Sequence, residues 1–67
     1  MNTLADELPR QQARCREILQ NALSIGAPGA FLVAMLRVSL ENAERAAAAG
    51  DTVAMLAACA DLQGYAE

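Results

Sequence analysis

A turn made of glycine and proline stands directly before a long apolar segment in residues 24–40, SIGAPGAFLVAMLRVSL. Arg37 is the only charged residue in this segment. Gly26 suits the C-terminal cap of one helix, and Pro28 suits the first turn of the next. Because so short a connection makes two helices antiparallel neighbours, the segment predicts a helical hairpin.

Periodicity and helix-ending residues predict three helices. The first begins either at residue 4, behind the capping residue Thr3, or at Pro9, because a proline removes a hydrogen bond from a helix interior. Gly50 ends the second helix, and Asp51 is a good N-cap for the third. The expected helices cover about residues 4 or 9 to 25, 29–49 and 52–62. The prediction is a single all-α domain over residues 1–67, an antiparallel helical hairpin with a short third helix.

Apolar residues recur at steps of three and four, which is typical of a helix face that packs against a neighbour. In the first helix these residues are Cys15, Ile18, Leu19, Ala22 and Ile25. In the second they are Leu32, Leu36, Leu40, Ala43 and Ala47. The apolar residues of the third helix span a wide arc and comprise Val53, Met55, Leu56, Cys59, Ala60 and Leu62.

The second helix carries another apolar set, roughly 120° to 150° around its axis from the first at 100° per residue. This set consists of Phe31, Ala34, Met35 and Val38. One neighbouring helix cannot cover both sides, so we expect the second set to meet its symmetry mates in a homodimer, the commonest closed arrangement. Two alternatives are a monomer whose third helix folds over this set and a permanent complex with another protein.

The small size of the chain supports self-association. A domain of 67 residues buries only about 60% of the surface of its unfolded chain, so its stability margin is thin. Natural domains of this size add a metal, disulfides or a second subunit. The chain has no histidine, and Cys15 and Cys59 form no metal-binding pair. Both cysteines lie at apolar positions, where we expect reduced thiols that pack as small hydrophobic groups.

Charge and hydropathy limit the partners and the location. The net charge is −3, and all five basic residues are arginines interspersed with acids, which makes nucleic-acid binding unlikely. The N-terminus lacks the basic and apolar regions of a signal peptide. The longest apolar run, residues 30–36, is far shorter than the ~20 residues of a membrane span. We therefore expect a cytoplasmic protein that does not enter a membrane.

The side chains offer little for catalysis. No histidine is present as a base, Ser24 and Ser39 have no evident activating partner, and neither cysteine has an electropositive setting. We expect no enzyme activity, no metal and no cofactor.

Binding of another protein is better supported, because aromatic and arginine residues carry much of the energy of interfaces. The candidate partner-binding residues are Arg14, Arg37, Arg45 and Tyr65. Glu41 and Arg45 are spaced as an ion pair on one helix face.

Three stretches carry a resemblance to a known group of proteins: RQQARCREIL, IGAPGAF and AERAAAAGDTVAMLAACADLQG. Over about residues 10–64 the chain resembles very small helical proteins of transposable, Mu-like bacteriophages and prophages of Pseudomonas and related bacteria. Some small phage accessory proteins bind and inhibit host regulators or machinery, including quorum-sensing activators and pilus-assembly ATPases. The resemblance implies a non-enzymatic inhibitor of a host protein, acting in the host cytoplasm, and assigns no role to particular residues.

Two other functions remain open from the sequence. One is a regulator or sponge that binds a nucleotide or another small ligand at the dimer seam, where Arg37 or Arg45 would meet an anion. The other, which the acidic balance disfavours, is a DNA-binding regulator.

Overall fold

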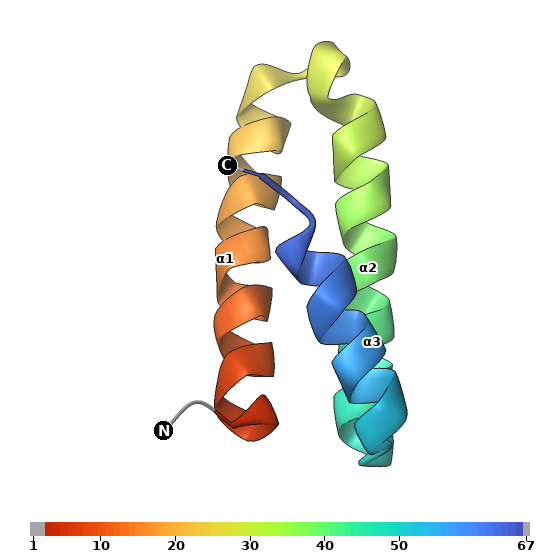
Figure 1. Cartoon of the computed structure of the whole chain (residues 1–67). Helices are drawn as coiled ribbons and strands as arrows, with labels where there is room; N and C mark the ends of the chain where they lie inside the picture. Colours follow the sequence, from red (N-terminus) through yellow and green to blue (C-terminus); the bar gives the residue numbers. More distant parts are fainter. Residues whose placement is uncertain (1–2, 67) are drawn as a thin grey trace.

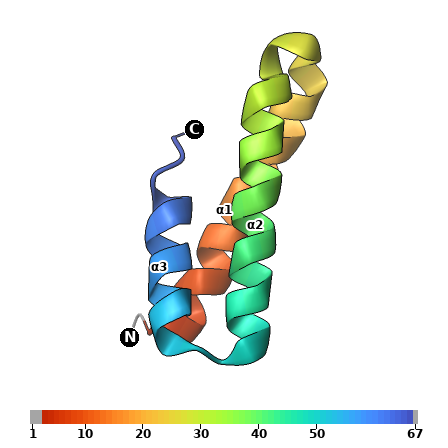
Figure 2. The same ribbon diagram turned by 90° about the vertical axis from the view of Figure 1, so that its right-hand side faces the viewer.

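The computed structural model describes residues 3–66 and consists of helices throughout, with no strand in this part of the chain. Three α-helices and one short 3₁₀ turn follow one another as α1 (Leu4–Ile25), η1 (Ala27–Gly29), α2 (Ala30–Ala49) and α3 (Thr52–Gln63). The long helices α1 and α2 run antiparallel side by side (Figure 1). The shorter α3 turns back along one half of this pair and leaves the half near η1 uncovered (Figure 2). The all-helical prediction with three helices is confirmed.

The first helix begins at Leu4, which is the longer of the two alternatives. Thr3 caps it, because the Thr3 hydroxyl accepts a hydrogen bond from the Asp6 N–H at 3.3 Å and donates one to the Asp6 carboxylate at 3.1 Å. Pro9 lies inside α1. Its ring nitrogen cannot donate to the carbonyl of Ala5, but Ala5 is exposed, so water can satisfy that carbonyl.

The turn between α1 and α2 brings the two backbones very close together. Gly26 has φ 85°, a conformation that favours glycine. Gly29 is buried, and a Cβ atom placed on it would lie 2.4 Å from the carbonyl oxygen of Ala22 in α1. Such contacts do not occur between real atoms, so the absence of a side chain at Gly29 allows η1 to pack against α1.

The turn between α2 and α3 uses the two residues that the sequence predicted. Gly50 ends α2 in the left-handed conformation with φ 66°. Asp51 caps α3, with its carboxylate accepting a hydrogen bond from the Ala54 N–H at 3.2 Å. These local signals reverse the chain without help from distant residues.

The core lies between the three helices, each of which packs against the other two. Its largest fully buried side chains are Leu8, Cys15, Leu36 and Leu62. Ile18, Leu40, Ala43, Ala46, Ala58 and Cys59 complete the buried cluster.

Two residues placed on core faces by the periodicity are exposed instead. Ala47 is exposed while its neighbour Ala46 is buried. The reason is that α3 packs on the side of α2 that carries Ala46 and Ser39, so the buried face of α2 is shifted toward that side. Ile25 is 63% exposed, because it is the last residue of α1, beyond the reach of α3 (Figure 2).

Both cysteines are free and buried. Burial raises the pKa of Cys15, and the nearby guanidinium of Arg14 opposes that rise only in part. Burial also raises the pKa of Cys59, with the Glu7 carboxylate adding to the effect. Since the thiolate is the reactive form, burial and the raised pKa both predict thiols of low reactivity.

We expect both cysteines to react with a disulfide reagent at pH 8 on the order of 100-fold more slowly in the folded protein than in urea, because reaction requires local opening. An Ala48→Cys variant is the control, since residue 48 is exposed and its thiol should react rapidly. Equal rates for all three thiols in the folded protein would contradict the buried positions.

The raised pKa values of the two cysteines also predict that the free energy of unfolding falls above about pH 8.5, where unfolded thiols ionise and folded thiols do not.

Within residues 3–66 no helix is both long enough and apolar enough to cross a membrane.

Candidate functional site

The exposed apolar residues at the N-terminal half of α2 form the strongest candidate surface. We call Phe31, Ala34, Met35 and Val38 the tip patch, because they lie toward the η1 end of the hairpin. All four are exposed; Phe31 is 78% exposed and Val38 59%. The alternative in which the third helix covers these residues is wrong, because α3 packs along the other half of the hairpin (Figure 2).

The end of α1 enlarges the apolar surface near η1. Leu23 and Ile25 are both exposed. Leu23 shares a groove of about 360 Å³ with Ala34 and Val33, while Ile25 shares one of about 320 Å³ with Leu32. The periodicity of the sequence predicted a core position for Ile25 and did not include Leu23. The short turn could have indicated this exposure, because residues beside it lie where only two helices meet and no third helix covers them.

The outward side of α3 is a second, separate apolar surface. Val53 is 77% exposed, and Leu56, Ala57 and Ala60 are also exposed. Asp61 is the only charged residue among the residues of α3 itself, so the helix has almost no polar side chains for its solvent side. A helix that is apolar all round is usually buried all round.

Arg37 lies beside the tip patch. It lines the same groove as Ala34 and Leu23, and within residues 3–66 it forms no ion pair or side-chain hydrogen bond. The structure thus brings one predicted partner-binding arginine next to the predicted self-association residues.

Arg45 has a different setting. Its guanidinium pairs with the Glu41 carboxylate one turn earlier, as the spacing predicted. It lines a groove of about 640 Å³ between α2 and α3, together with Val38 on the same helix and with Asp51 and Asp61 across the groove. Because two carboxylates lie there, the groove does not favour a nucleotide or another anion.

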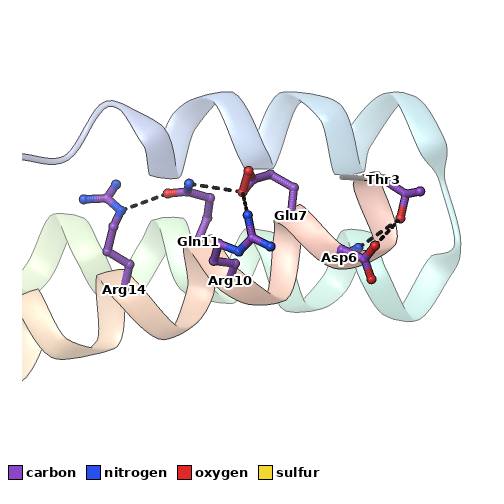
Figure 3. A network of polar contacts seen from close by, with 6 residues as sticks. All are labelled: Thr3, Asp6, Glu7, Arg10, Gln11 and Arg14. Atoms are coloured by element: carbon purple, nitrogen blue, oxygen red, sulfur yellow. Dashed lines mark hydrogen bonds and ion pairs between the residues drawn. The ribbon is translucent and has the colours of Figure 1, made fainter. Parts of the chain in front are cut away.

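The other two predicted partner-binding residues, Arg14 and Tyr65, contact each other within the chain. The Arg14 guanidinium donates to the backbone carbonyls of Tyr65 and Leu62, both at 2.7 Å. Its Nε donates to Gln11 at 2.9 Å, and Gln11 in turn donates to Glu7 along the same helix (Figure 3). Arg14 is half-buried and joins α1 to the C-terminal end of α3.

Tyr65 extends this connection to α2. Its hydroxyl and that of Ser39 share a hydrogen bond of 2.9 Å, so Ser39, which had no partner in the sequence analysis, has one in the fold. The Cys15 thiol donates to the Leu62 carbonyl at 3.4 Å. These contacts tie the end of α3 to both long helices and explain why Arg14 and Tyr65 are only partly accessible.

Replacing Arg14 by methionine, which keeps a long side chain but no donors, is expected to lower the free energy of unfolding by about 1–2 kcal/mol, because two carbonyls lose a charged partner. The control is Arg16→Met. Arg16 pairs with Glu44 at 3.6 Å and both side chains are more than half exposed, so a loss below about 0.5 kcal/mol is expected. Urea denaturation followed by circular dichroism measures both, and equal losses would contradict a bracing role for Arg14.

Within the described residues, no group of three or more histidine, cysteine, aspartate or glutamate side chains is arranged to hold a metal ion. No protein-family model matches the chain, and neither a curated protein nor a solved structure was found to be similar to it.

Proposed function

We propose that this chain is a non-enzymatic protein-interaction module that forms a homodimer through the tip patch and blocks another protein by covering part of its surface. The observation that carries the proposal is the exposure of Phe31, Met35 and Val38 on one side of a regular helix. Contiguous apolar patches on small soluble proteins commonly mark interaction sites.

The size of the chain favours a second copy on the tip patch. A three-helix core drawn from 67 residues stabilises the fold only marginally. Burying Phe31, Met35 and Val38 against their symmetry mates would add apolar burial at roughly 25 cal/mol per Å². A two-fold contact also closes the assembly at two subunits, because the tip patch of each copy is then covered by that of the other.

A dimer of this kind would leave Arg37 at the rim of the seam and the outer face of α3 free for another protein. The resemblance to small proteins of Mu-like phages supports a host protein of a bacterium as that partner, such as a quorum-sensing activator or a pilus-assembly ATPase. Inhibition would be steric, and the module would act in the bacterial cytoplasm.

The first test is the solution mass by light scattering over a concentration series. We expect the mass of two chains of 7.0 kDa each, and a monomer at every concentration would contradict the dimer. The tagged protein is then used to capture partners from a bacterial lysate. A captured regulator or ATPase that loses its activity when the purified module is added supports the blocking role, while full activity of every captured protein contradicts it.

A further inference from the structure

A groove lies between α2 and α3, away from α1, and no segment of residues 3–66 fills it. It has a volume of about 640 Å³ and is open to solvent along its length. Five of the residues that line it are alanines, namely Ala46, Ala49, Ala54, Ala57 and Ala58, and five are polar or charged, namely Ser39, Asn42, Arg45, Asp51 and Asp61. Small side chains on both helices let the backbone of a further helix approach closely, and an apolar groove between two helices is a common docking place for an amphipathic helix.

The polar residues of this groove differ in whether they already have a charged partner. Arg45 is paired with Glu41 on its own helix. Asp61 forms no ion pair or side-chain hydrogen bond within residues 3–66, and one oxygen of Asp51 caps α3 while the group keeps its negative charge. The groove therefore has alanines between two polar edges: Ser39, Asn42 and the paired Arg45 lie on the α2 side, and Asp51 and Asp61 lie on the α3 side. A docked helix would need basic residues at the negatively charged α3 edge.

A second copy of this chain matches these requirements poorly. Its net charge is −3, and α3 contains no basic residue. Of its arginines, Arg10, Arg16 and Arg45 already pair with glutamates, and Arg14 donates to the end of α3. The remaining arginine, Arg37, is a single side chain and could not pair with both Asp51 and Asp61. Electrostatic complementarity therefore favours a different, basic chain over self-association at this site.

We propose that the groove between α2 and α3 binds one amphipathic helix of a partner protein, with small apolar residues facing Ala57 and Ala58 and basic residues facing Asp51 and Asp61. The two aspartates are ten residues apart in the sequence, which corresponds to about 15 Å along a helix. The basic residues of the partner helix would accordingly be about ten or eleven residues apart. The inference rests on the proposed function, because it assigns the partner of the module to a surface separate from most of the tip patch.

The test uses two fluorescein-labelled helical peptides of about 20 residues, a length at which an alanine-rich helix can form in water. The basic probe carries alanine and leucine on one face and two lysines eleven positions apart beside that face. The acidic probe is identical except that both lysines are glutamates. Fluorescence anisotropy with the full chain is expected to give a dissociation constant about tenfold lower for the basic probe. Equal binding of the two probes, or no binding of either, would overturn the inference.

Two matched variants locate the binding site. Ala57 and Ala60 are both exposed on α3, but only Ala57 lines the groove. Ala57→Trp fills the groove and should weaken binding of the basic probe about tenfold or more, whereas Ala60→Trp should leave it within about twofold. Asp61→Asn should remove most of the preference for the basic probe. Equal effects of the two tryptophans would overturn the assignment.

The solution mass of the same samples separates this inference from the proposed dimer. A monomeric wild-type protein that still prefers the basic probe contradicts the dimer and supports the groove. A dimer in which Ala57→Trp and Ala60→Trp behave alike contradicts the groove and leaves the dimer intact. If Ala57→Trp alone converts a dimer into a monomer, the groove holds a second copy, and the proposed basic helix is wrong.

Discussion

Replacing Phe31 by aspartate is expected to convert the proposed dimer into a folded monomer and to raise its dissociation constant about 100-fold or more, as for the central residues of interfaces. Phe31 is 78% exposed in the single chain, so a carboxylate at this position remains solvated in the monomer. At a two-fold seam the same change would bring two negative charges together and remove the largest apolar side chain of the tip patch. Light scattering measures the mass, and circular dichroism shows whether the helices persist.

Val53→Asp is the matched control for Phe31→Asp. Val53 is 77% exposed, but it lies on the outer side of α3. The same charge there should leave the mass of the proposed dimer unchanged. If Val53→Asp dissociates the protein and Phe31→Asp does not, the seam lies on α3. If neither variant changes the mass, self-association through either face is excluded.

Replacing Gly29 by alanine is expected to lower the free energy of unfolding by about 2–3 kcal/mol, at the upper end of the cost of an added methyl group in a close-packed site. The new Cβ would lie 2.4 Å from the Ala22 carbonyl oxygen. The oxygen is a backbone atom and the new Cβ is bonded directly to the backbone, so the contact can be relieved only by moving η1 away from α1. Urea denaturation followed by circular dichroism measures the loss, and for so small a domain a loss of this size is a large part of the total stability.

Ala48→Ser is the control for this substitution, because it also adds one heavy atom but at an exposed position of α2. A loss of about 0.5 kcal/mol is expected there from helix propensity. A Gly29→Ala variant as stable as the wild type would mean that the two helices are farther apart at this turn. Because the tip patch begins two residues later at Phe31, a displaced turn should also weaken the proposed dimer.

The helix ends were largely predictable, because they depend on residues within one turn of each other. Thr3 and Asp51 cap α1 and α3 as their types and positions predicted. Gly26 and Gly50 adopt positive φ at the ends of α1 and α2. The start of α1 was left open between Leu4 and Pro9, because the cost of an internal proline depends on whether water reaches the carbonyl that it leaves unpaired.

The buried arcs were predicted less well. Periodicity identified Leu36, Leu40 and Ala43 as core residues of α2, and they are buried. It placed Ala47 there in error and missed Val33, Ser39 and Ala46, while Leu32 is only partly buried. For Ser39 and Ala46 the reason is that a helical wheel does not show on which side a third helix packs. The same limit applies to the α2–α3 groove, which exists only because α3 returns beside α2.

The candidate site shows the same division between local and distant effects. The apolar character of Phe31, Met35 and Val38 was evident from their spacing, and the structure adds that α3 leaves them exposed. Arg14 and Tyr65 were predicted to bind a partner because arginine and aromatic residues carry much of the energy of interfaces. Their contact joins residues 51 positions apart, and no local pattern encodes so distant a pair.

The sequence by itself determined the three helices, their caps and the excess of apolar residues on α2 and α3, because these follow from the conformational preferences and hydropathy of neighbouring residues. Only the tertiary structure decided which apolar faces are covered, which arginines are engaged within the chain and where the α2–α3 groove lies. The physical reason is that helix length and the direction of the second turn place α3 beside one half of the hairpin, so burial and pairing depend on residues that meet only after folding.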